Sequence, residues 1–150
     1  MTKGIYALVL EIKEEINLNI GKNKNYNFLP GYYIYIGSAL GEFSNSIENR
    51  LKRHFSNDKK IFWHIDYLLA SPLVKPIKAY YAETNQKKEC KLAAQLSNFK
   101  KSNIFSNFGN SDCQSGCKTH LFYFNNMSNL DDIIVSAFKN IDLTSVPFIN

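Results

Sequence analysis

Residues 31–41 read GYYIYIGSALG, and an earlier stretch, residues 4–12, reads GIYALVLEI. Both are rich in the β-branched and aromatic residues that favour strands. Turn-forming residues separate them, so we expect an antiparallel hairpin with a wide loop. Because side chains alternate along a strand, Tyr33 and Tyr35 are expected on one face, and Tyr6 is expected to approach Tyr35 across the hairpin.

Gly37 comes two residues after Tyr35 and has no side chain. A glycine in a strand often marks a place where another group approaches the backbone closely. We therefore expect room for a sugar-phosphate backbone beside Tyr35. The alternative is a tyrosine-rich sheet face that simply packs.

The rest of the chain contains both helix and strand patterns, which indicates an α+β protein. We predict helices over 44–55, 62–70, 85–99 and 127–140, a third strand over 76–83 and a late strand over 119–124. Ser44 or Ser46 is a candidate N-cap for the first helix, and Thr84 for the third. We divide the chain into a domain over 1–125 and a C-terminal helical appendage, 126–150, packed on it.

The charge is +5 for 150 residues, with 45% hydrophobic and 21% charged residues. Basic charge spread along a chain favours a polyanionic partner, although a lysine-rich composition alone would produce the same balance. No apolar run is long enough to span a membrane, so we expect no membrane partner. The first residues do not resemble a secretory signal, so we expect a cytoplasmic protein.

The first predicted helix carries two basic side chains at the border of its apolar stripe. Ile47, Leu51 and Phe55 form the stripe, and Arg50 and His54 lie one turn apart along its edge. A guanidinium held at the edge of a core can bind a phosphate with its planar fork.

The third predicted helix carries a carboxylate on its apolar face. Leu92, Ala93, Leu96 and Phe99 mark that face, and Glu89 lies within it. A carboxylate there needs a compensating cation, which could be a metal ion or, in a structural role, an arginine. The nearby Glu83 is an alternative acid.

Taken in order, the strings GIY (4–6), YIG (35–37), RLKRH (50–54) and KKECKLA (87–93) resemble the GIY-YIG nuclease superfamily. The resemblance covers about the first hundred residues. It implies a small three-stranded antiparallel sheet flanked by helices, here with the late extra strand and the C-terminal helix. It also implies hydrolysis of DNA phosphodiester bonds with one divalent cation, Mg²⁺ or Mn²⁺.

The resemblance also implies roles for individual residues. Tyr6 would help to deprotonate the attacking water, Tyr35 would position water or phosphate, and Arg50 would stabilise charge on the transferring phosphate. His54 would contact phosphate or relay a proton, and Glu89 would hold the metal ion. Residues assigned to substrate binding are Gly37, Ser38, Lys52, Arg53 and Asn110; of these, Lys52 and Arg53 are expected to point outward as solvated charges.

A second metal is one interpretation of the cysteines. Cys113, Cys117 and His120 have a spacing that could serve Zn²⁺, with Cys90 as a fourth ligand. The alternative is a set of small buried side chains, or a cysteine pair that oxidises.

The sequence therefore predicts a metal-dependent endonuclease acting on DNA, with branched or damaged DNA among the candidate substrates and repair or recombination as its setting. The alternative is a nucleic-acid-binding module with the same fold that cleaves little. A further alternative is a protein-interaction domain that recruits partners through its C-terminal helix. A homodimer would suit a small nuclease that makes double-strand breaks.

Overall fold

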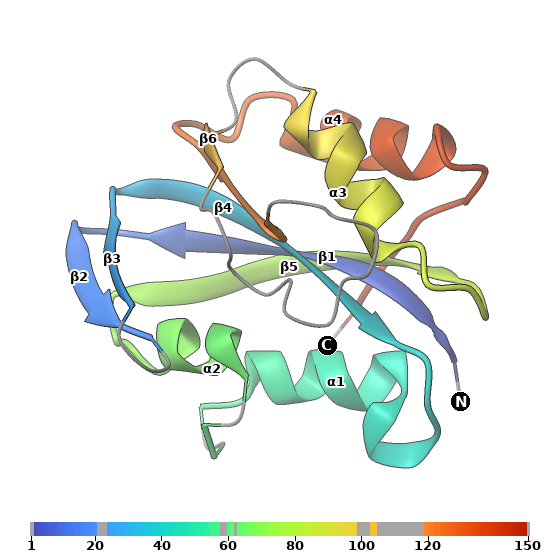
Figure 1. Cartoon of the computed structure of the whole chain (residues 1–150), viewed down its shortest axis with the longest axis horizontal. Coiled ribbons are helices and arrows are strands. Elements are labelled where there is room, and N and C mark those ends of the chain that lie inside the picture. Colours follow the sequence, from blue (N-terminus) through green and yellow to red (C-terminus); the bar gives the residue numbers. More distant parts are fainter. Residues whose placement is uncertain are drawn as a thin grey trace.

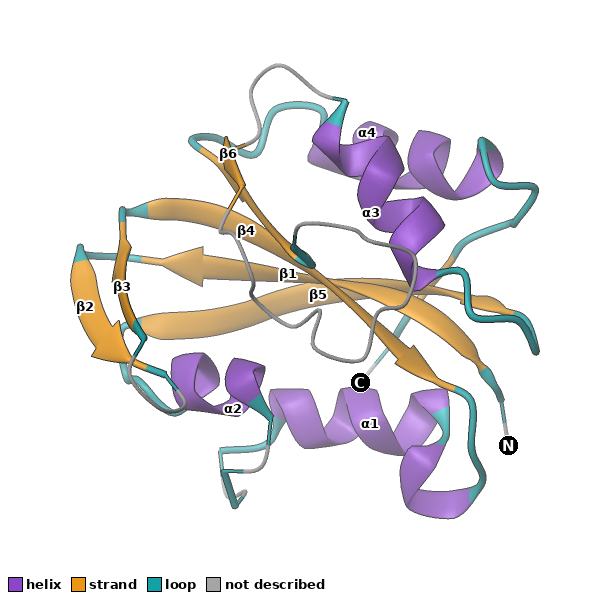
Figure 2. Cartoon of the chain, in the orientation of Figure 1, coloured by secondary structure: helices purple, strands orange, loops and turns teal. Residues whose placement is uncertain are grey.

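The computed structural model describes residues 2–20, 24–57, 60–61, 63–98, 103–104 and 119–149. A central sheet is covered by helices on both faces, with α1 and α2 on one face and α3 and α4 on the other (Figures 1 and 2). In chain order the elements are β1 (Gly4–Ile12), β2 (Ile16–Asn19), β3 (Asn25–Phe28), β4 (Gly31–Ala39), the 3-10 helix η1 (Phe43–Asn45), α1 (Ile47–Phe55), α2 (His64–Leu69), β5 (Val74–Glu83), α3 (Glu89–Ser97), β6 (Asn103–Ile104), β7 (Leu121–Phe124), α4 (Leu130–Lys139) and β8 (Val146–Pro147).

The central sheet is larger than the sequence predicted. Among the described residues it has six antiparallel strands in the order β6-β7-β4-β1-β5-β8, and β2 and β3 form a separate two-stranded sheet. The prediction of a small three-stranded sheet is therefore wrong. The three long strands β4, β1 and β5 do form its centre, but short strands from distant parts of the chain pair with both of their outer edges. The predicted late strand is present as β7, but its pairing with β4 and the two-residue strands β6 and β8 were not foreseen.

The predicted antiparallel pairing of β1 with β4 is confirmed. In its register Tyr6 lies opposite Gly37, and Leu8 lies opposite Tyr35. The wide loop between these strands contains the hairpin of β2 and β3, which lies at the left of Figure 1. Asn17 and Asn25 are diagonal neighbours across this hairpin and exchange side-chain hydrogen bonds of 2.7 and 2.6 Å.

Alternating residues of the strands enter two separate cores. The buried residues on the α1/α2 face are Tyr6, Leu8, Leu10, Ile12, Ile20, Phe28, Tyr33, Tyr35, Ala39, Ile47, Leu51, Ile65, Leu68, Leu69, Val74, Ala79 and Leu121. Those on the α3/α4 face are Ile5, Ala7, Val9, Ile34, Ile36, Ala82, Leu92, Ala93, Leu96, Phe122, Phe124, Leu130, Ile134, Ala137, Phe138 and Ile141. The expectation that Tyr6, Tyr33 and Tyr35 share a face is thus confirmed.

The helix boundaries follow from local hydrogen bonds. Ser46 caps α1, since its hydroxyl oxygen accepts the backbone N–H of Asn49 at 3.4 Å. The third helix begins later than predicted, at Glu89. Thr84 does not cap it; its hydroxyl oxygen accepts the N–H of Gln86 at 3.1 Å within a preceding turn.

The last 25 residues contribute to both faces of the sheet. The buried side chains of α4 pack with those of α3, and β8 extends the sheet beyond β5. Phe148 then stacks on Phe55 of α1, with ring centroids 6.0 Å apart. Within the described parts of the chain, every helix is too short or too polar to cross a bilayer.

Candidate active site

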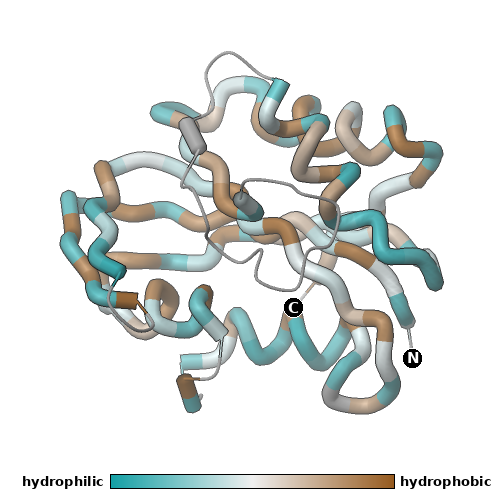
Figure 3. Tube along the Cα trace, viewed as in Figure 1, coloured by the Kyte–Doolittle hydropathy of each residue, from teal (hydrophilic) through white to brown (hydrophobic). Residues whose placement is uncertain are grey.

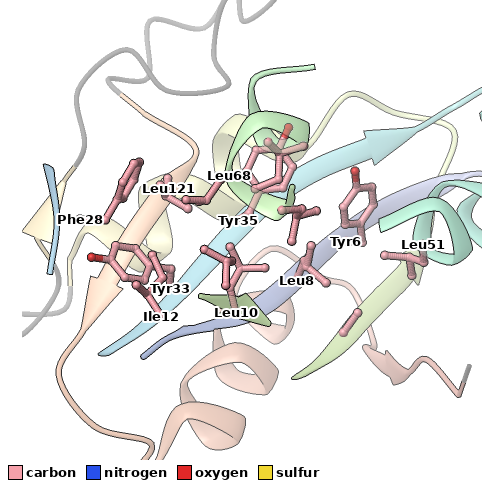
Figure 4. Close-up of a cluster of buried hydrophobic side chains, with 14 of the residues drawn as sticks. Tyr6, Leu8, Leu10, Ile12, Phe28, Tyr33, Tyr35, Leu51, Leu68 and Leu121 are labelled. Carbon is pink, nitrogen blue, oxygen red and sulfur yellow. The ribbon is translucent and has the colours of Figure 1, made fainter. Parts of the chain in front are cut away.

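A buried tyrosine–histidine pair lies where β1 meets α1. The hydroxyl oxygen of Tyr6 is 2.7 Å from Nε2 of His54, and the two side chains are 2% and 1% exposed. When the His54 proton is on Nδ1, Tyr6 donates this hydrogen bond to Nε2. Tyr35 projects from β4 on the same side of the sheet, and Leu51 of α1 lies beside Tyr6 (Figure 4). The Tyr35 ring centroid is 6.4 Å from that of Tyr6 and 6.2 Å from that of His54.

Gly37 explains how the Tyr6 ring fits. A Cβ atom at Gly37 would lie 2.4 Å from both Cζ and the hydroxyl oxygen of Tyr6. Because the ring is buried against this glycine, it could not move away easily. The space beside the strand, which the sequence suggested for a sugar-phosphate backbone, is filled by the Tyr6 ring.

Burial controls the protonation of Tyr6. It raises the pKa of this phenol well above the ordinary value of 10.0, and the neighbouring Tyr35 raises it further, whereas the positive charge of Arg50 opposes the shift. Tyr6 is therefore a neutral phenol at neutral pH. It can accept a proton from another group only if it gives up its own phenolic proton. Nε2 of His54 is the acceptor in contact with it.

Arg50 holds a positive charge beside this pair. Its Nη1 donates to the carbonyl oxygen of Ser38, and its Nη2 donates to Oδ1 of Asn45 at 3.2 Å. Among the described residues the ion pairs are Arg53 with Asp66 and Lys78 with Asp131, so none of the carboxylates in this part of the chain pairs with Arg50. Ser38, predicted to bind substrate, thus contributes its backbone carbonyl to holding Arg50.

Sequence reasoning missed the group formed by Trp63, Arg53 and Asp66. Arg53 was expected to be a solvated charge, but its Nη2 lies 2.5 Å from Oδ2 of Asp66, a residue that is 0% exposed. The guanidiniums of Arg50 and Arg53 both lie over the ring of Trp63. The one available signal was the single tryptophan of the chain followed by an acid three residues later. Lys52, by contrast, is exposed.

Glu89 is the first residue of α3, half-buried, and its Oε2 is buried without a hydrogen-bond partner in the part of the chain that the structure describes. The buried apolar residues of α3 pack on the face opposite α1, and Glu89 stands at the start of this helix. A series of contacts links the two places. Cys90 Sγ is 3.5 Å from Nε2 of His120, and the carbonyl oxygen of His120 accepts the N–H of Ile36, next to Gly37.

The residues present fit a single hard cation better than a protein-built metal cage. The described residues contain no group of three or more histidine, cysteine or acidic side chains placed to hold a metal. A buried carboxylate oxygen with no hydrogen-bond partner is nevertheless what a Mg²⁺ or Mn²⁺ ion would neutralise, because such ions keep waters and phosphate oxygens as their other ligands. Glu83, the alternative acid, is exposed.

Several predicted residues cannot be placed. Asn110, Cys113 and Cys117 lie outside the described residues. The other two residues suggested for Zn²⁺ are Cys90 and His120, which lie close to each other and are buried. Cys90 is disulfide-bonded. A sulfur in a disulfide is not available as a thiolate ligand.

A family comparison covers nearly all of this architecture. Residues 5–143 match the family described as Domain of unknown function DUF123. The match begins at the isoleucine of the GIY string and ends four residues after α4. No curated protein and no solved structure matches the chain. Because the match spans far more than half of the sequence, the chain belongs to the family Domain of unknown function DUF123.

Proposed function

We propose that this protein is a metal-dependent endonuclease that hydrolyses phosphodiester bonds in DNA. The observation that carries the proposal is the 2.7 Å hydrogen bond between Tyr6 and His54 beside Arg50, a cation without an ion-pair partner among the described residues. A proton acceptor next to an uncompensated guanidinium suits a reaction in which water loses a proton as a phosphate gains charge. The resemblance of the GIY and YIG strings to GIY-YIG nucleases supports the same reaction.

The pair works as a proton relay. As a water molecule attacks phosphorus, its proton passes to the Tyr6 oxygen while the Tyr6 proton passes to Nε2 of His54. A bond forms between the water oxygen and phosphorus, and the bond to the leaving ester oxygen breaks. That oxygen takes up a proton from solvent water, and His54 returns its extra proton to solvent after cleavage. These proton transfers never require a free phenolate, which agrees with the raised pKa of Tyr6. It requires neutral His54, so the cleavage rate should fall on acidification.

Arg50 and Tyr35 act on the phosphate. The guanidinium has five N–H groups, and two of its nitrogens already donate to Ser38 and Asn45. Its remaining N–H groups can bind phosphate oxygens as negative charge grows on them in the transition state. Tyr35 lies beside both Tyr6 and His54, where its hydroxyl can orient the water or a phosphate oxygen.

Glu89 would hold the divalent cation through its buried Oε2. When bound, Mg²⁺ supplies positive charge to the phosphate oxygens and lowers the cost of ionising a water molecule. The net charge of +5 favours a nucleic acid as the substrate. DNA, including branched or damaged forms, is the class that the resemblance indicates.

A second candidate is a nucleic-acid-binding module that does not cleave. The observation favouring it is the burial of Tyr6, which at 2% exposure offers little of its hydroxyl to a water molecule. Such a module would bind DNA with a steep dependence on salt, because the basic groups displace counterions. It would do so without a divalent cation.

The test is nicking of supercoiled plasmid and of a branched oligonucleotide with Mg²⁺ or Mn²⁺. Arg50→Ala, Glu89→Gln and Tyr6→Phe should each lower the rate by about 100-fold or more, as is typical when one transition-state contact is lost. Lys139→Ala removes an exposed cation of α4 and serves as the matched control that keeps wild-type activity. Each variant is first checked for folding by circular dichroism.

The outcomes separate the two candidates. Cleavage by the wild type and the control that is lost in the three site variants supports the nuclease. Salt-sensitive DNA binding without cleavage by any protein supports the binding module. Equal cleavage by all proteins indicates a contaminating nuclease and removes the support for this site.

A further inference from the structure

Trp63 is in contact with three basic side chains of α1. The guanidinium carbon of Arg50 lies 4.8 Å from the Trp63 ring centroid, and that of Arg53 lies 4.7 Å away. The His54 ring meets the same indole edge-on, with centroids 6.2 Å apart. Indole is the aromatic ring that attracts cations most strongly, so these contacts are favourable beyond simple packing.

Asp66 holds the backbone of Trp63. Its Oδ2 accepts the backbone N–H of Trp63 at 2.9 Å and pairs with Arg53 at 2.5 Å. Arg53 also donates to the carbonyl oxygen of Lys60 at 2.7 Å. The indole is therefore held through its own backbone and through the guanidinium of Arg53.

Asp66 also reduces the repulsion between the two arginines. Two guanidiniums near one ring repel each other, but the buried carboxylate neutralises Arg53. Arg50 has no carboxylate partner among the described residues, and its Nη1 and Nη2 donate to Ser38 and Asn45. Its Nε is buried and makes no hydrogen bond within the described residues, which leaves the ring contact to restrain that part of the side chain.

We propose that Trp63 is a positioning residue for Arg50, and that Arg53 and Asp66 hold Trp63 in place. The inference rests on the proposed nuclease function, in which Arg50 binds the phosphate. A free arginine side chain samples many rotamers, and ordering it during the reaction would slow the reaction. The ring orders the guanidinium in advance, next to the Tyr6–His54 pair.

The experiment compares Trp63→Leu, which removes the ring, with Trp63→Phe, which keeps a weaker one. Asp66→Asn is a further variant that retains the indole but loosens its anchor. Tyr67→Ala is the matched control, because Tyr67 is an exposed aromatic residue of the same helix. Two quantities are measured: steady-state cleavage, resolved into kcat and KM, and the ¹H–¹⁵N heteronuclear NOE of the Arg50 Nε–H group, which reports its mobility.

We expect Trp63→Leu to lower kcat by about 10- to 100-fold, as for a catalytic group that is misplaced, with little change in KM. The NOE of Arg50 should fall in this variant, recover in part in Trp63→Phe, and fall to an intermediate extent in Asp66→Asn. Tyr67→Ala should match the wild type in both measurements. A structural role alone would lower thermal stability without this selective loss of Arg50 order.

The NOE decides the positioning role separately from the enzyme activity. An unchanged Arg50 NOE in folded Trp63→Leu overturns the proposal, whatever the kinetics. If that variant does not fold, the NOE of Trp63→Phe and of Asp66→Asn decides in the same way. Wild type that cleaves nothing but shows the expected NOE series overturns the nuclease and retains the positioning of Arg50.

Discussion

On the α3/α4 face of the sheet, β1 and β4 bury Ile5, Ala7, Val9, Ile34 and Ile36, whereas alternate residues of the same strands place Tyr6, Tyr33 and Tyr35 on the α1/α2 face. The helices differ in the same sense. Buried residues of α4 are apolar, but α1 buries His54, α2 buries Asp66, and α1 is hydrophilic along most of its length (Figure 3).

The difference shows how one sheet can combine stability with a polar site. Burial of aliphatic and phenyl groups stabilises the fold without requiring partners. Burial of a phenol, an imidazole or a carboxylate costs desolvation energy unless each finds a hydrogen bond or a counter-charge. Tyr6 has His54, Tyr33 donates to the carbonyl oxygen of Leu29, and Asp66 has Arg53. The α1/α2 face thus places polar groups in fixed geometry, which a site requires.

The largest effect tests the apolar face. Phe138 of α4 is 0% exposed, so Phe138→Ala should lower the free energy of unfolding by about 3–5 kcal/mol through lost burial and the cavity that remains. Cleavage per folded molecule should not change. Urea unfolding measures the loss, and Val135→Ala, on the exposed side of the same helix, should change it by less than about 0.5 kcal/mol. A loss of similar size in both variants would contradict the assignment of this core.

The next-largest effect tests the ion pair between Arg53 and Asp66 on the α1/α2 face. Asp66→Asn leaves Arg53 without its counter-charge and should cost about 2–3 kcal/mol, below the full value for buried pairs because Arg53 is 27% exposed. Thermal and urea unfolding give the loss. Asp142→Asn is the control, since it removes an exposed carboxylate at a left-handed backbone position that asparagine accepts readily. If Asp66→Asn lowers the free energy of unfolding no more than the control does, the ion pair contributes nothing to stability.

The third effect concerns the fit between Gly37 and Tyr6. Gly37→Ala places a Cβ atom against the Tyr6 ring and should destabilise the fold by about 1–3 kcal/mol, as overpacking does. Adding Tyr6→Ala removes the clash, so the double variant should be more stable than the sum of the single effects predicts. Additive losses would show that the two residues are not coupled. Weaker DNA binding with unchanged stability would restore the interpretation of Gly37 as room for a backbone.

The smallest effect concerns the ion pair between Lys78 of β5 and Asp131 of α4. Lys78 donates to Asp131 and lowers the pKa of this carboxyl from its ordinary 3.8, with Tyr80 as a second donor. A lowered pKa in the folded state stabilises the fold above pH 3.8, and this contribution disappears as the pH falls through the lower folded value. Asp131→Asn should therefore cost about 0.2–1 kcal/mol at pH 7, as for exposed pairs, and nothing in strong acid. A pH-independent difference in melting temperature would contradict this.

Local patterns predicted much of the fold and part of the candidate site. The alternation in 4–12 and 31–39 predicted the shared face of the tyrosines, and helical spacing put Arg50 and His54 at the edge of an apolar stripe. The size of the sheet was not predictable in this way, because β7 and β8 join it through pairing with strands more than 60 residues away. The role of Arg53 was missed for the same reason. Its partner Asp66 belongs to another helix, and helical spacing describes one helix at a time.

By itself the sequence determined which side chains point to the same side of each strand and helix, since that depends on backbone periodicity, a local property. Tertiary structure alone decided which of those sides meet. It brought Tyr6 within 2.7 Å of His54, placed two arginines over Trp63, and put Glu89 at the start of a helix that packs on the other face of the sheet. These outcomes depend on how apolar faces from distant segments pack and on which buried polar groups find partners, and both are settled only when the whole chain is folded.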